Sequence, residues 1–223
     1  MKKIQNIDKM KNFLLNILFP LECLNCMTKN EILCEYCIRK IRKAEATIDK
    51  NIIAIFDYKD PIIKKAIWQL KYYHRRYLGE KLGNILYEHS IENISFLKTM
   101  SPDEPIYVIP VPISKKRTKF RGYNQSKMIS KGFCNSSEDK ILKLKNNIIT
   151  KTKETIPQAK ITNRNKRLKN IQGVFKIKNP KIVKGKVIIV IDDVTTTGGT
   201  IKEIIKILNK AKAKKVVGFA LAH

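Results

Sequence analysis

Acidic residues are scarce in this chain of 223 residues, where 19 Asp and Glu stand against 46 Lys and Arg and give a formal net charge of +27. Long apolar runs are missing as well, since the longest is Val216–Ala222 and a membrane-spanning helix needs roughly 20 residues. We therefore expect no insertion into a membrane. Hydrophobic residues still make up 43% of the chain, which is typical of a globular protein. The length fits one domain of ordinary size, or a compact domain with a small appendage.

The two common nucleotide-binding motifs are absent. None of the nine glycines belongs to a GxGxxG pattern, and no GxxxxGK(S/T) sequence occurs. The three histidines, His74, His89 and His223, are not spaced as a catalytic pair. Any nucleotide site in this chain must therefore be built in another way.

The positive charge is unevenly distributed. Lysine supplies 38 of the basic residues, and the chain also holds 35 Ile and 17 Asn, a bias that a whole genome can impose on any of its proteins. Residues 106–186, however, hold 22 basic and 3 acidic side chains, a net charge of +19, whereas residues 1–45 have a net charge of +4. We expect part of this central segment to face an anionic partner.

The N-terminus resembles a signal peptide only superficially. Early lysines precede the apolar stretch Phe13–Phe19, but Asn16 interrupts that stretch, Pro20 ends it, and no small-residue cleavage site follows. We interpret this segment as a short amphipathic helix. Because no export signal is recognisable, we expect a cytoplasmic protein.

Four of the five cysteines form two CxxC pairs, with seven residues between the pairs: Cys23, Cys26, Cys34 and Cys37. Each pair can turn two thiolates toward one ion, and two pairs complete a tetrahedral site for a structural Zn²⁺ that leaves no open position for catalysis. Disulfides would need an oxidising compartment, and a redox CxxC would account for only one pair. Cys134 stands outside the pattern and is expected to be an ordinary thiol.

From about residue 47 onward, strand and helix patterns alternate, which is typical of a mainly parallel sheet flanked by helices. Lys186–Ile191 is a nearly continuous apolar run, as a strand buried on both faces needs. The expected strands are 51–58, 106–112, 148–150, 186–191 and 215–221, and the expected helices are 61–73, 77–91, 126–133 and 201–209.

The segment Ile188–Thr200, with the sequence IIVIDDVTTTGGT, carries the clearest chemistry. A buried strand leads into two carboxylates, a Thr/Gly turn and the start of a helix, so the turn lies at the carboxyl edge of the sheet, where ligands bind. The backbone N–H groups and threonine hydroxyls of such a turn suit phosphate, and Gly198 and Gly199 allow a close approach. Asp192 and Asp193 suit ribose hydroxyls or a hydrated Mg²⁺.

Two segments also have plainer interpretations. Thr200-x-x-Glu203 fits a capping box at the start of the last helix, which would coexist with ligand binding. An aromatic and basic group could stack on single-stranded nucleic acid, but we favour packing of its tryptophan and one or two tyrosines in the core. Its members are Trp68, Tyr72, Tyr73, Arg75, Arg76 and Tyr77.

Four pieces of sequence, in order along nearly the whole chain, resemble one family. Ile188–Thr200 looks like the phosphoribosyl pyrophosphate (PRPP) fingerprint of type I phosphoribosyltransferases, and the double CxxC resembles the zinc finger of the competence protein F (ComF, ComFC) family. The other two pieces resemble that family's PVPL…R…RGFNQ and Q…R..N..GAF signatures. They are Pro110–Ile113 with Arg117 and Arg121–Gln125, and Gln158 with Arg167–Asn170 and Gly173–Phe175.

This resemblance implies a parallel-sheet α/β fold of the type I phosphoribosyltransferases in residues 46–223, with an N-terminal helix and four-cysteine zinc finger in residues 1–45. By position, Asp192 and Asp193 would hold the ribose hydroxyls of PRPP. Its 5′-phosphate would be bound by Thr195, Thr196, Thr197, Gly198, Gly199 and Thr200. Its pyrophosphate, carrying Mg²⁺, would lie near Ser114, Lys115, Lys116 and Arg117. We expect catalytic roles for Asp192, Asp193, Arg117 and Arg121.

The family's link to natural transformation further implies a role in DNA uptake. Single-stranded DNA and a DNA-uptake helicase or recombination mediator would then be partners. We therefore expect a PRPP-binding, phosphoribosyltransferase-like protein that acts in DNA uptake. The alternatives are a PRPP or nucleotide sensor without turnover and a housekeeping phosphoribosyltransferase whose acceptor the resemblance does not specify.

Overall fold

The structure is a computed structural model that describes residues 21–45, 49–73, 75–137, 140–153, 171 and 173–223. The chain divides into two compact units, Met1–Ile41 and Arg42–His223. The predicted helix around Phe13–Phe19, His74, and the family-like residues Gln158 and Arg167–Asn170 lie outside the described residues. None of the helices that the structure describes combines the length and apolar character that crossing a membrane would take.

The first unit is a small module built around a reversal of the chain. An isolated bridge pairs Glu22 with Lys29, and the backbone N–H of Cys23 donates to the carbonyl of Thr28 at 2.9 Å. One short helix, α2 (Glu35–Arg39), follows the turn. The reversal and the helix bring the two CxxC pairs together.

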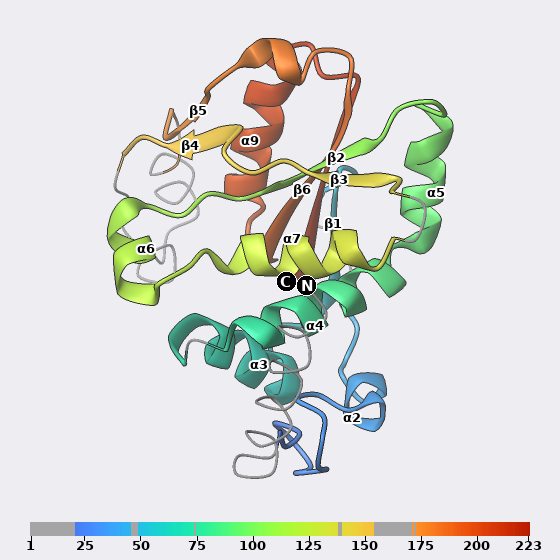
Figure 1. Ribbon diagram of the computed structural model, residues 1–223, viewed down its shortest axis with the longest axis vertical. Helices are drawn as coiled ribbons and strands as arrows, with labels where there is room; N and C mark the ends of the chain where they lie inside the picture. The colour runs from blue at the N-terminus through green and yellow to red at the C-terminus, as the bar shows by residue number, and fades with distance from the viewer. Residues whose placement is uncertain (1–20, 46–48, 74, 138–139, 154–170, 172) are drawn as a thin grey trace, which may run out of the picture. The chain divides into compact units, whose positions relative to one another are not determined.

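The second unit contains a five-stranded sheet in the order β1-β7-β6-β2-β3, in which every neighbouring pair is parallel (Figure 1). A separate antiparallel pair is formed by β4 and β5. The mainly parallel sheet that the alternating pattern predicts is therefore confirmed. The strands are β1 (Ile52–Phe56), β2 (Ile106–Pro110), β3 (Leu142–Leu144), β4 (Ile149–Lys151), β5 (Phe175–Ile177), β6 (Val187–Val194) and β7 (Lys215–Ala222).

The helices agree with the predicted ones in place, with two differences. The helix expected at 77–91 ends earlier, at Glu88, and is followed by a further helix at Ile91–Thr99 that was not predicted. The expected loop after Pro112 contains a short helix of its own. The helices are α3 (Pro61–Tyr72), α4 (Arg76–Glu88), α5 (Ile91–Thr99), α6 (Lys115–Arg121), α7 (Gln125–Asn135) and α9 (Gly199–Lys210), with a 3₁₀ turn at Pro180–Ile182.

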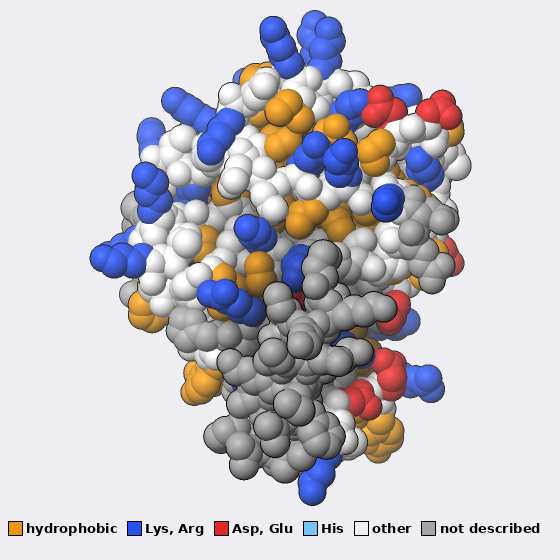
Figure 2. Space-filling view, viewed as in Figure 1, with side chains coloured by type: hydrophobic (Ala, Val, Ile, Leu, Met, Phe, Trp, Pro, Cys, Tyr) orange, Lys and Arg blue, Asp and Glu red, His pale blue; other side chains and the backbone are white. Residues whose placement is uncertain are grey.

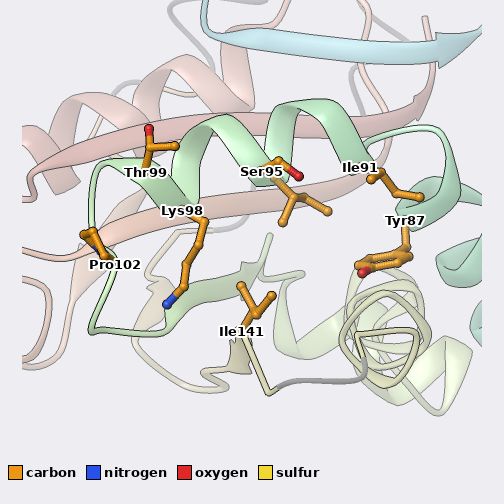
Figure 3. A pocket seen from close by; sticks show the side chains of 8 residues that line it. Tyr87, Ile91, Ser95, Lys98, Thr99, Pro102 and Ile141 are labelled. Atoms are coloured by element: carbon orange, nitrogen blue, oxygen red, sulfur yellow. The ribbon is translucent and has the colours of Figure 1, made fainter.

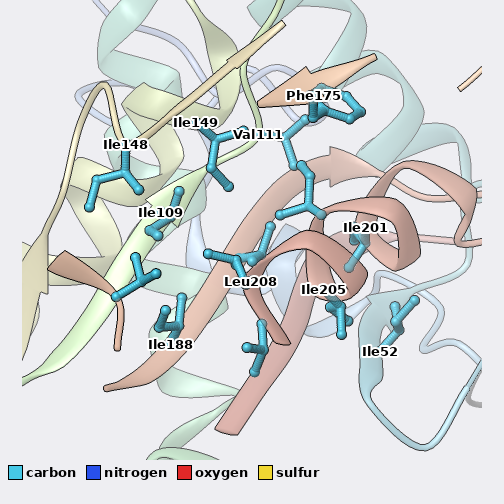
Figure 4. Close-up of a cluster of buried hydrophobic side chains, with 14 of the residues drawn as sticks. Ile52, Ile109, Val111, Ile148, Ile149, Phe175, Ile188, Ile201, Ile205 and Leu208 are labelled. Carbon is cyan, nitrogen blue, oxygen red and sulfur yellow. The ribbon is translucent and has the colours of Figure 1, made fainter. Parts of the chain in front are cut away.

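Both faces of the sheet are covered. On one face the apolar stripe of α9 packs with the β4–β5 pair over a cluster that includes Ile109, Ile188 and Leu208 (Figure 4). On the other face α7 packs on the sheet, and the rings of Phe133 and Phe219 meet at 5.9 Å. The sheet is buried on both sides, which explains the continuous apolar sequence of β6.

Helices α4 and α7 approach each other unusually closely. A methyl group added at Gly132 would lie 2.1 Å from the carbonyl oxygen of Glu80, and one added at Gly83 would lie 2.1 Å from that of Ile129. Only glycine fits at these positions, because such distances are far inside van der Waals contact. The glycines therefore fix how tightly α4 lies against α7.

The order of the strands indicates where a ligand would bind. From β2 the chain crosses to β3 on one side, whereas from β6 it crosses to β7 on the other side. Strands β2 and β6 are neighbours, with Pro110 opposite Ile191. The direction of winding thus reverses between them, and in open α/β sheets the crevice at the carboxyl ends of such a pair is the usual ligand site.

Candidate functional site

The two predicted carboxylates lie at the carboxyl end of β6, which extends three residues beyond the expected strand. Asp192 Oδ1 accepts hydrogen bonds from Ser126 Oγ at 3.0 Å and from the backbone N–H of Asp193 at 2.9 Å. Among the described residues, no donor forms a hydrogen bond to Asp192 Oδ2. This oxygen can therefore accept a hydrogen bond from a hydroxyl group of a ligand. Burial raises the pKa of Asp192 to about 7, and the charge of Asp193 adds to the rise.

Asp193 is already engaged in this ligand-free structure. Its Oδ1 accepts from the backbone N–H of Val194 at 2.7 Å, and its Oδ2 pairs with Lys71 Nζ at 2.9 Å. Burial disfavours the charged form of Lys71, but the charge and the hydrogen bond of Asp193 outweigh it and raise the pKa of Lys71. A ribose hydroxyl at Asp193 would therefore share the carboxylate with the mostly buried side chain of Lys71.

Lys71 and Ser126 contact the acid pair, but no sequence pattern predicted them as site residues. They lie on α3 and α7, more than 60 residues before the acids, and only the fold brings them to the end of β6. The sequence holds one usable signal for Lys71, which continues the four-residue spacing of Ile63 and Ile67 on the buried side of α3. A lysine on that side of the helix needs a carboxylate partner.

The Thr/Gly turn leads directly from β6 into α9. Gly198 precedes the helix with a left-handed φ of 73°, and both it and Gly199 are buried. The turn is tied to the end of β7, because the N–H of Thr195 donates to the carbonyl of Ala222 at 2.9 Å and His223 Nε2 lies 2.9 Å from the carbonyl of Thr196. The turn is thus held in place before any ligand binds.

Within this turn, the hydroxyl of Thr197 is buried and has no hydrogen-bond partner among the described residues. A buried polar atom without a partner is costly, and a bound phosphate oxygen would supply the missing bond. The buried hydroxyl therefore supports the predicted role of Thr197.

The predicted capping box at Thr200 and Glu203 is wrong. Helix α9 begins at Gly199, two residues earlier than the box requires, and no side chain caps it. The carboxylate of Glu203 instead accepts a hydrogen bond from the backbone N–H of Gly173 at 3.0 Å. The first N–H groups of α9 are therefore not occupied by a side-chain cap.

The predicted pyrophosphate residues follow β2, the neighbour of β6, and begin at the same edge of the sheet. The backbone N–H of Val111 donates to the carbonyl of Ile191 at 2.9 Å, which joins the two strand ends. The expected loop is in fact helix α6, which begins after Ser114 because the Ser114 hydroxyl accepts from the N–H of Arg117. Lys115 and Lys116 are exposed on its first turn.

The segment after α6 returns to the same edge. Asn124 Nδ2 donates to the carbonyl of Val111 at 2.9 Å, and Arg121 donates to Gln125 Oε1 at 3.1 Å. Asn124 Oδ1 and Gln125 Nε2 are buried and have no hydrogen-bond partners among the described residues. The whole of Gln125 is only 1% exposed. The structure therefore brings Arg121 and two unsatisfied amide groups to the β2 side of the edge.

The preferred interpretation of the aromatic group is wrong. Trp68, Tyr72, Tyr73 and Tyr77 are 48%, 47%, 53% and 61% exposed, so none of them is a core residue. Helix α3 buries instead its aliphatic positions, among them Ile63, Ile67 and Leu70, which supply enough apolar surface to hold the helix. The aromatic side chains form the opposite, solvent-facing side.

In the first unit, the four predicted cysteines come together. The sulfur atoms of Cys23, Cys26, Cys34 and Cys37 all lie within 4.8 Å of one another, and all four are free thiols. Tetrahedral coordination with Zn–S distances near 2.3 Å places neighbouring sulfurs about 3.8 Å apart, and Cys26 and Cys34 already lie 3.5 Å apart. Four sulfur ligands at this spacing fit a metal ion bound by four thiolates, so the cluster could hold zinc.

A pocket of about 560 Å³ lies away from these sites, between α4, α5 and the start of β3 (Figure 3). Tyr87, Ile91, Lys98 and Ile141 are among its lining residues. Ile141 and the end of α5 precede the strands that they adjoin, so this pocket lies toward the amino ends of the sheet. None of the predicted site residues lines it.

Comparison with known proteins agrees with the geometry. A family model described as the phosphoribosyl transferase domain matches residues 144–223, which include β6, the turn and α9. Competence protein F of Haemophilus influenzae is 27% identical over 202 residues, covering 90% of this chain and 84% of the relative. Competence protein ComFC of Bacillus subtilis is 32% identical over 121 residues, covering 54% and 45%.

A DNA utilization protein, YhgH, of Escherichia coli O157:H7 is 27% identical over 174 residues, covering 78% of this chain and 72% of the relative. The match to competence protein F covers 90% of the chain and so includes parts of both the cysteine-containing unit and the sheet-containing unit. Together with the four-cysteine cluster and the parallel sheet, these matches show that the chain is similar to the ComF family and that residues 144–223 belong to a phosphoribosyl transferase domain.

Proposed function

We propose that this protein binds PRPP at the carboxyl edge between β2 and β6. One observation carries the proposal: an acid pair at the end of β6 leads into a pre-formed turn whose buried Thr197 hydroxyl has no partner in the part of the chain that the structure describes. Asp192 and Asp193 would accept hydrogen bonds from the ribose hydroxyls, and the turn Thr195–Thr200 would hold the 5′-phosphate.

The residues after β2 would then receive the pyrophosphate of PRPP, whose oxygens carry most of the coordination of Mg²⁺. In a transfer reaction, an acceptor forms a bond to C1 of the ribose while the bond from C1 to the pyrophosphate oxygen breaks, and the electron pair leaves with pyrophosphate. Lys115, Lys116 and Arg117 would stabilise the growing negative charge, with Arg121 beside them. Asp192 and Asp193 would hold the ribose during the transfer.

Thermal unfolding in the presence of PRPP and Mg²⁺ tests the proposal. A ligand at 100 times its Kd stabilises the folded state by about 2.7 kcal/mol, so Tm should rise with PRPP concentration. Ribose 5-phosphate and pyrophosphate, each holding only part of the contacts, should stabilise less. An unchanged Tm at millimolar PRPP would reject the site.

A protein that binds PRPP can be an enzyme, which transfers the phosphoribosyl group to an acceptor, or a sensor, which binds PRPP without turnover. Release of pyrophosphate from PRPP, measured across nucleobases and single-stranded DNA as acceptors, separates the two. Release that depends on one acceptor identifies a phosphoribosyltransferase. PRPP binding without release identifies a sensor.

We also propose that the protein handles single-stranded DNA during uptake, together with a helicase or recombination mediator. The relatives named above are competence and DNA utilization proteins, and residues 106–186 carry a net charge of +19. On the face shown in Figure 2, the left-hand side displays Lys and Arg side chains without acidic ones. Binding driven by phosphate neutralisation should weaken steeply as salt rises, and an affinity that is flat between low and moderate salt would contradict it.

For the first unit we propose that the bound ion is zinc with a structural role. The four sulfur ligands fill a tetrahedral site, so no water can be activated there. X-ray fluorescence of freshly purified protein should show one zinc per chain. A substoichiometric trace would overturn the assignment.

A further inference from the structure

Three aromatic side chains at the end of α3 form an exposed group that we call the aromatic ridge: Trp68, Tyr72 and Tyr73. The rings of Trp68 and Tyr72 are 5.9 Å apart, and those of Trp68 and Tyr73 are 5.0 Å apart. All three are about half exposed, although a tryptophan and two tyrosines would normally bury most of their apolar surface. An exposed aromatic group of this size indicates a contact with something outside the chain.

The ridge adjoins the carboxyl edge of the sheet. With 3.6 residues per helical turn, Lys71 and Tyr72 lie about 60° and 40° to either side of Trp68 around the α3 axis. Lys71 reaches Asp193 at 2.9 Å. The same turn of α3 therefore contacts the acid pair on one side and presents the ridge on the other.

One arginine, Arg121, borders the ridge, and Arg76 lies over the ring of Tyr123, which is not part of the ridge. The guanidinium of Arg121 lies 5.4 Å from the ring centre of Tyr72, and that of Arg76 lies 5.4 Å from the ring centre of Tyr123. Figure 1 shows the turn between α3 and α4 beside α6, the helix that ends with Arg121. Arginine is scarce in this chain, with 8 residues against 38 lysines, so the lysine-rich composition does not account for Arg121 at the ridge.

The ridge is also held rigidly. The hydroxyl of Tyr123 donates to the carbonyl of Leu70, which ties the segment after α6 to the last turn of α3. Gln125 accepts a hydrogen bond from Arg121, and its buried Nε2 has no partner among the residues that the structure describes. The ring faces and the cation are therefore positioned in advance, and a polar donor close to them still lacks an acceptor.

We propose that the aromatic ridge is a stacking site for nucleobases, with Arg121 as its cationic edge. Exposed aromatic faces beside a guanidinium suit a planar base that is joined to a phosphate, and they suit neither an aliphatic nor a purely anionic ligand. The base can come from a single strand or from a free nucleotide. The inference deepens the proposed DNA handling, because it names the chemical group that is recognised and the side chains that recognise it.

The chain contains a single tryptophan, Trp68, so the ridge reports its own occupancy. Titration with a short oligothymidylate should quench the Trp68 fluorescence, because a base stacks on the indole ring. An abasic strand of the same length, with the same phosphates and no bases, should leave the fluorescence unchanged. Thymidine monophosphate forms a third arm, and quenching by it at similar concentrations would identify free nucleotides as the source of the base.

Variants then test the side chains. Tyr72→Ala/Tyr73→Ala keeps the reporter and should weaken oligothymidylate binding about tenfold or more, as expected for loss of a stacked base. Phe96→Ala is the matched control, since Phe96 on α5 is a 61% exposed aromatic residue outside the ridge, and its affinity should equal that of the wild type. Far-ultraviolet circular dichroism of each variant shows whether it is folded.

Equal binding of the abasic strand and oligothymidylate, with no quenching, would overturn the stacking site. The salt-dependent DNA binding proposed above would survive that result, because it needs only phosphates. Conversely, quenching by bases with no dependence of affinity on salt would retain the ridge and remove the electrostatic part.

Discussion

Replacement of Asp192 by Asn is predicted to stabilise the folded protein, and more strongly at high pH. Burial raises the pKa of Asp192 from 3.8 to about 7, and the charge of Asp193 adds to the rise. Between these pH values the unfolded chain releases the Asp192 proton while the folded protein keeps it. The free energy of unfolding therefore falls as the pH rises through this window, and the full loss is reached above about pH 7.

The magnitude follows from the width of the window. Each pH unit costs the folded state about 1.4 kcal/mol, which gives about 2 kcal/mol at about pH 5.5 and about 4 kcal/mol at about pH 8.5. Asn carries no charge and avoids this cost. The Asn Oδ1 can still accept the hydrogen bonds from Ser126 Oγ and from the N–H of Asp193. In the wild type these bonds measure 3.0 and 2.9 Å.

Urea unfolding of wild type and Asp192→Asn at these two pH values measures the effect. We expect the gain in the free energy of unfolding to be about 2 kcal/mol larger at the higher pH. Asp103→Asn, at an exposed carboxylate, is the control and should show no such difference. A gain that is equal at both pH values, or a loss at high pH, would refute the account of Asp192 as a buried acid.

Three other variants test separate parts of the structure. Lys71→Met leaves the carboxylate of Asp193 without its ion-pair partner, so the free energy of unfolding should fall by about 3 kcal/mol in urea titrations. A fall of less than about 1 kcal/mol would show that the ion pair contributes little to stability. Gly132→Ala forces a methyl group against the Glu80 carbonyl and should cost about 1–3 kcal/mol, seen as a lower Tm, and an unchanged Tm would contradict the close packing of α4 on α7. Thr197→Val removes an unpaired buried hydroxyl, so stability should stay the same or rise while the affinity for ribose 5-phosphate falls about tenfold, and equal affinity would remove Thr197 from the phosphate turn.

The parts of the fold that the sequence predicts are those with strong periodicity. The apolar run of β6 and the helical spacing in α9 are sufficient for both elements, and the acid pair at the end of β6 marks the ligand edge. Helix α6 was not predictable, because it buries no residue and so shows no apolar stripe. Strands β3 and β5 have three residues each, too few for an alternating pattern.

Contacts between distant segments account for the other differences. Nothing local to Lys71 specifies Asp193 as its partner, and nothing near Glu203 indicates that it binds the N–H of Gly173 rather than capping α9. For the aromatic ridge, the sequence pattern predicted burial in the core, whereas the side chains are about half exposed. Aromatic residues at helical spacing usually belong to a core, but aliphatic residues of the same helix fill that core here, and Trp68 is left at the surface.

The central claim is that the acid pair at the end of β6 binds the ribose of PRPP. Isothermal titration calorimetry of PRPP with Mg²⁺, on wild type and Asp192→Asn/Asp193→Asn, tests it most directly. We expect binding by the wild type and an affinity at least about tenfold lower for the double variant, since two charge-assisted hydrogen bonds are weakened. Equal affinities for the two proteins would contradict the assignment of the site.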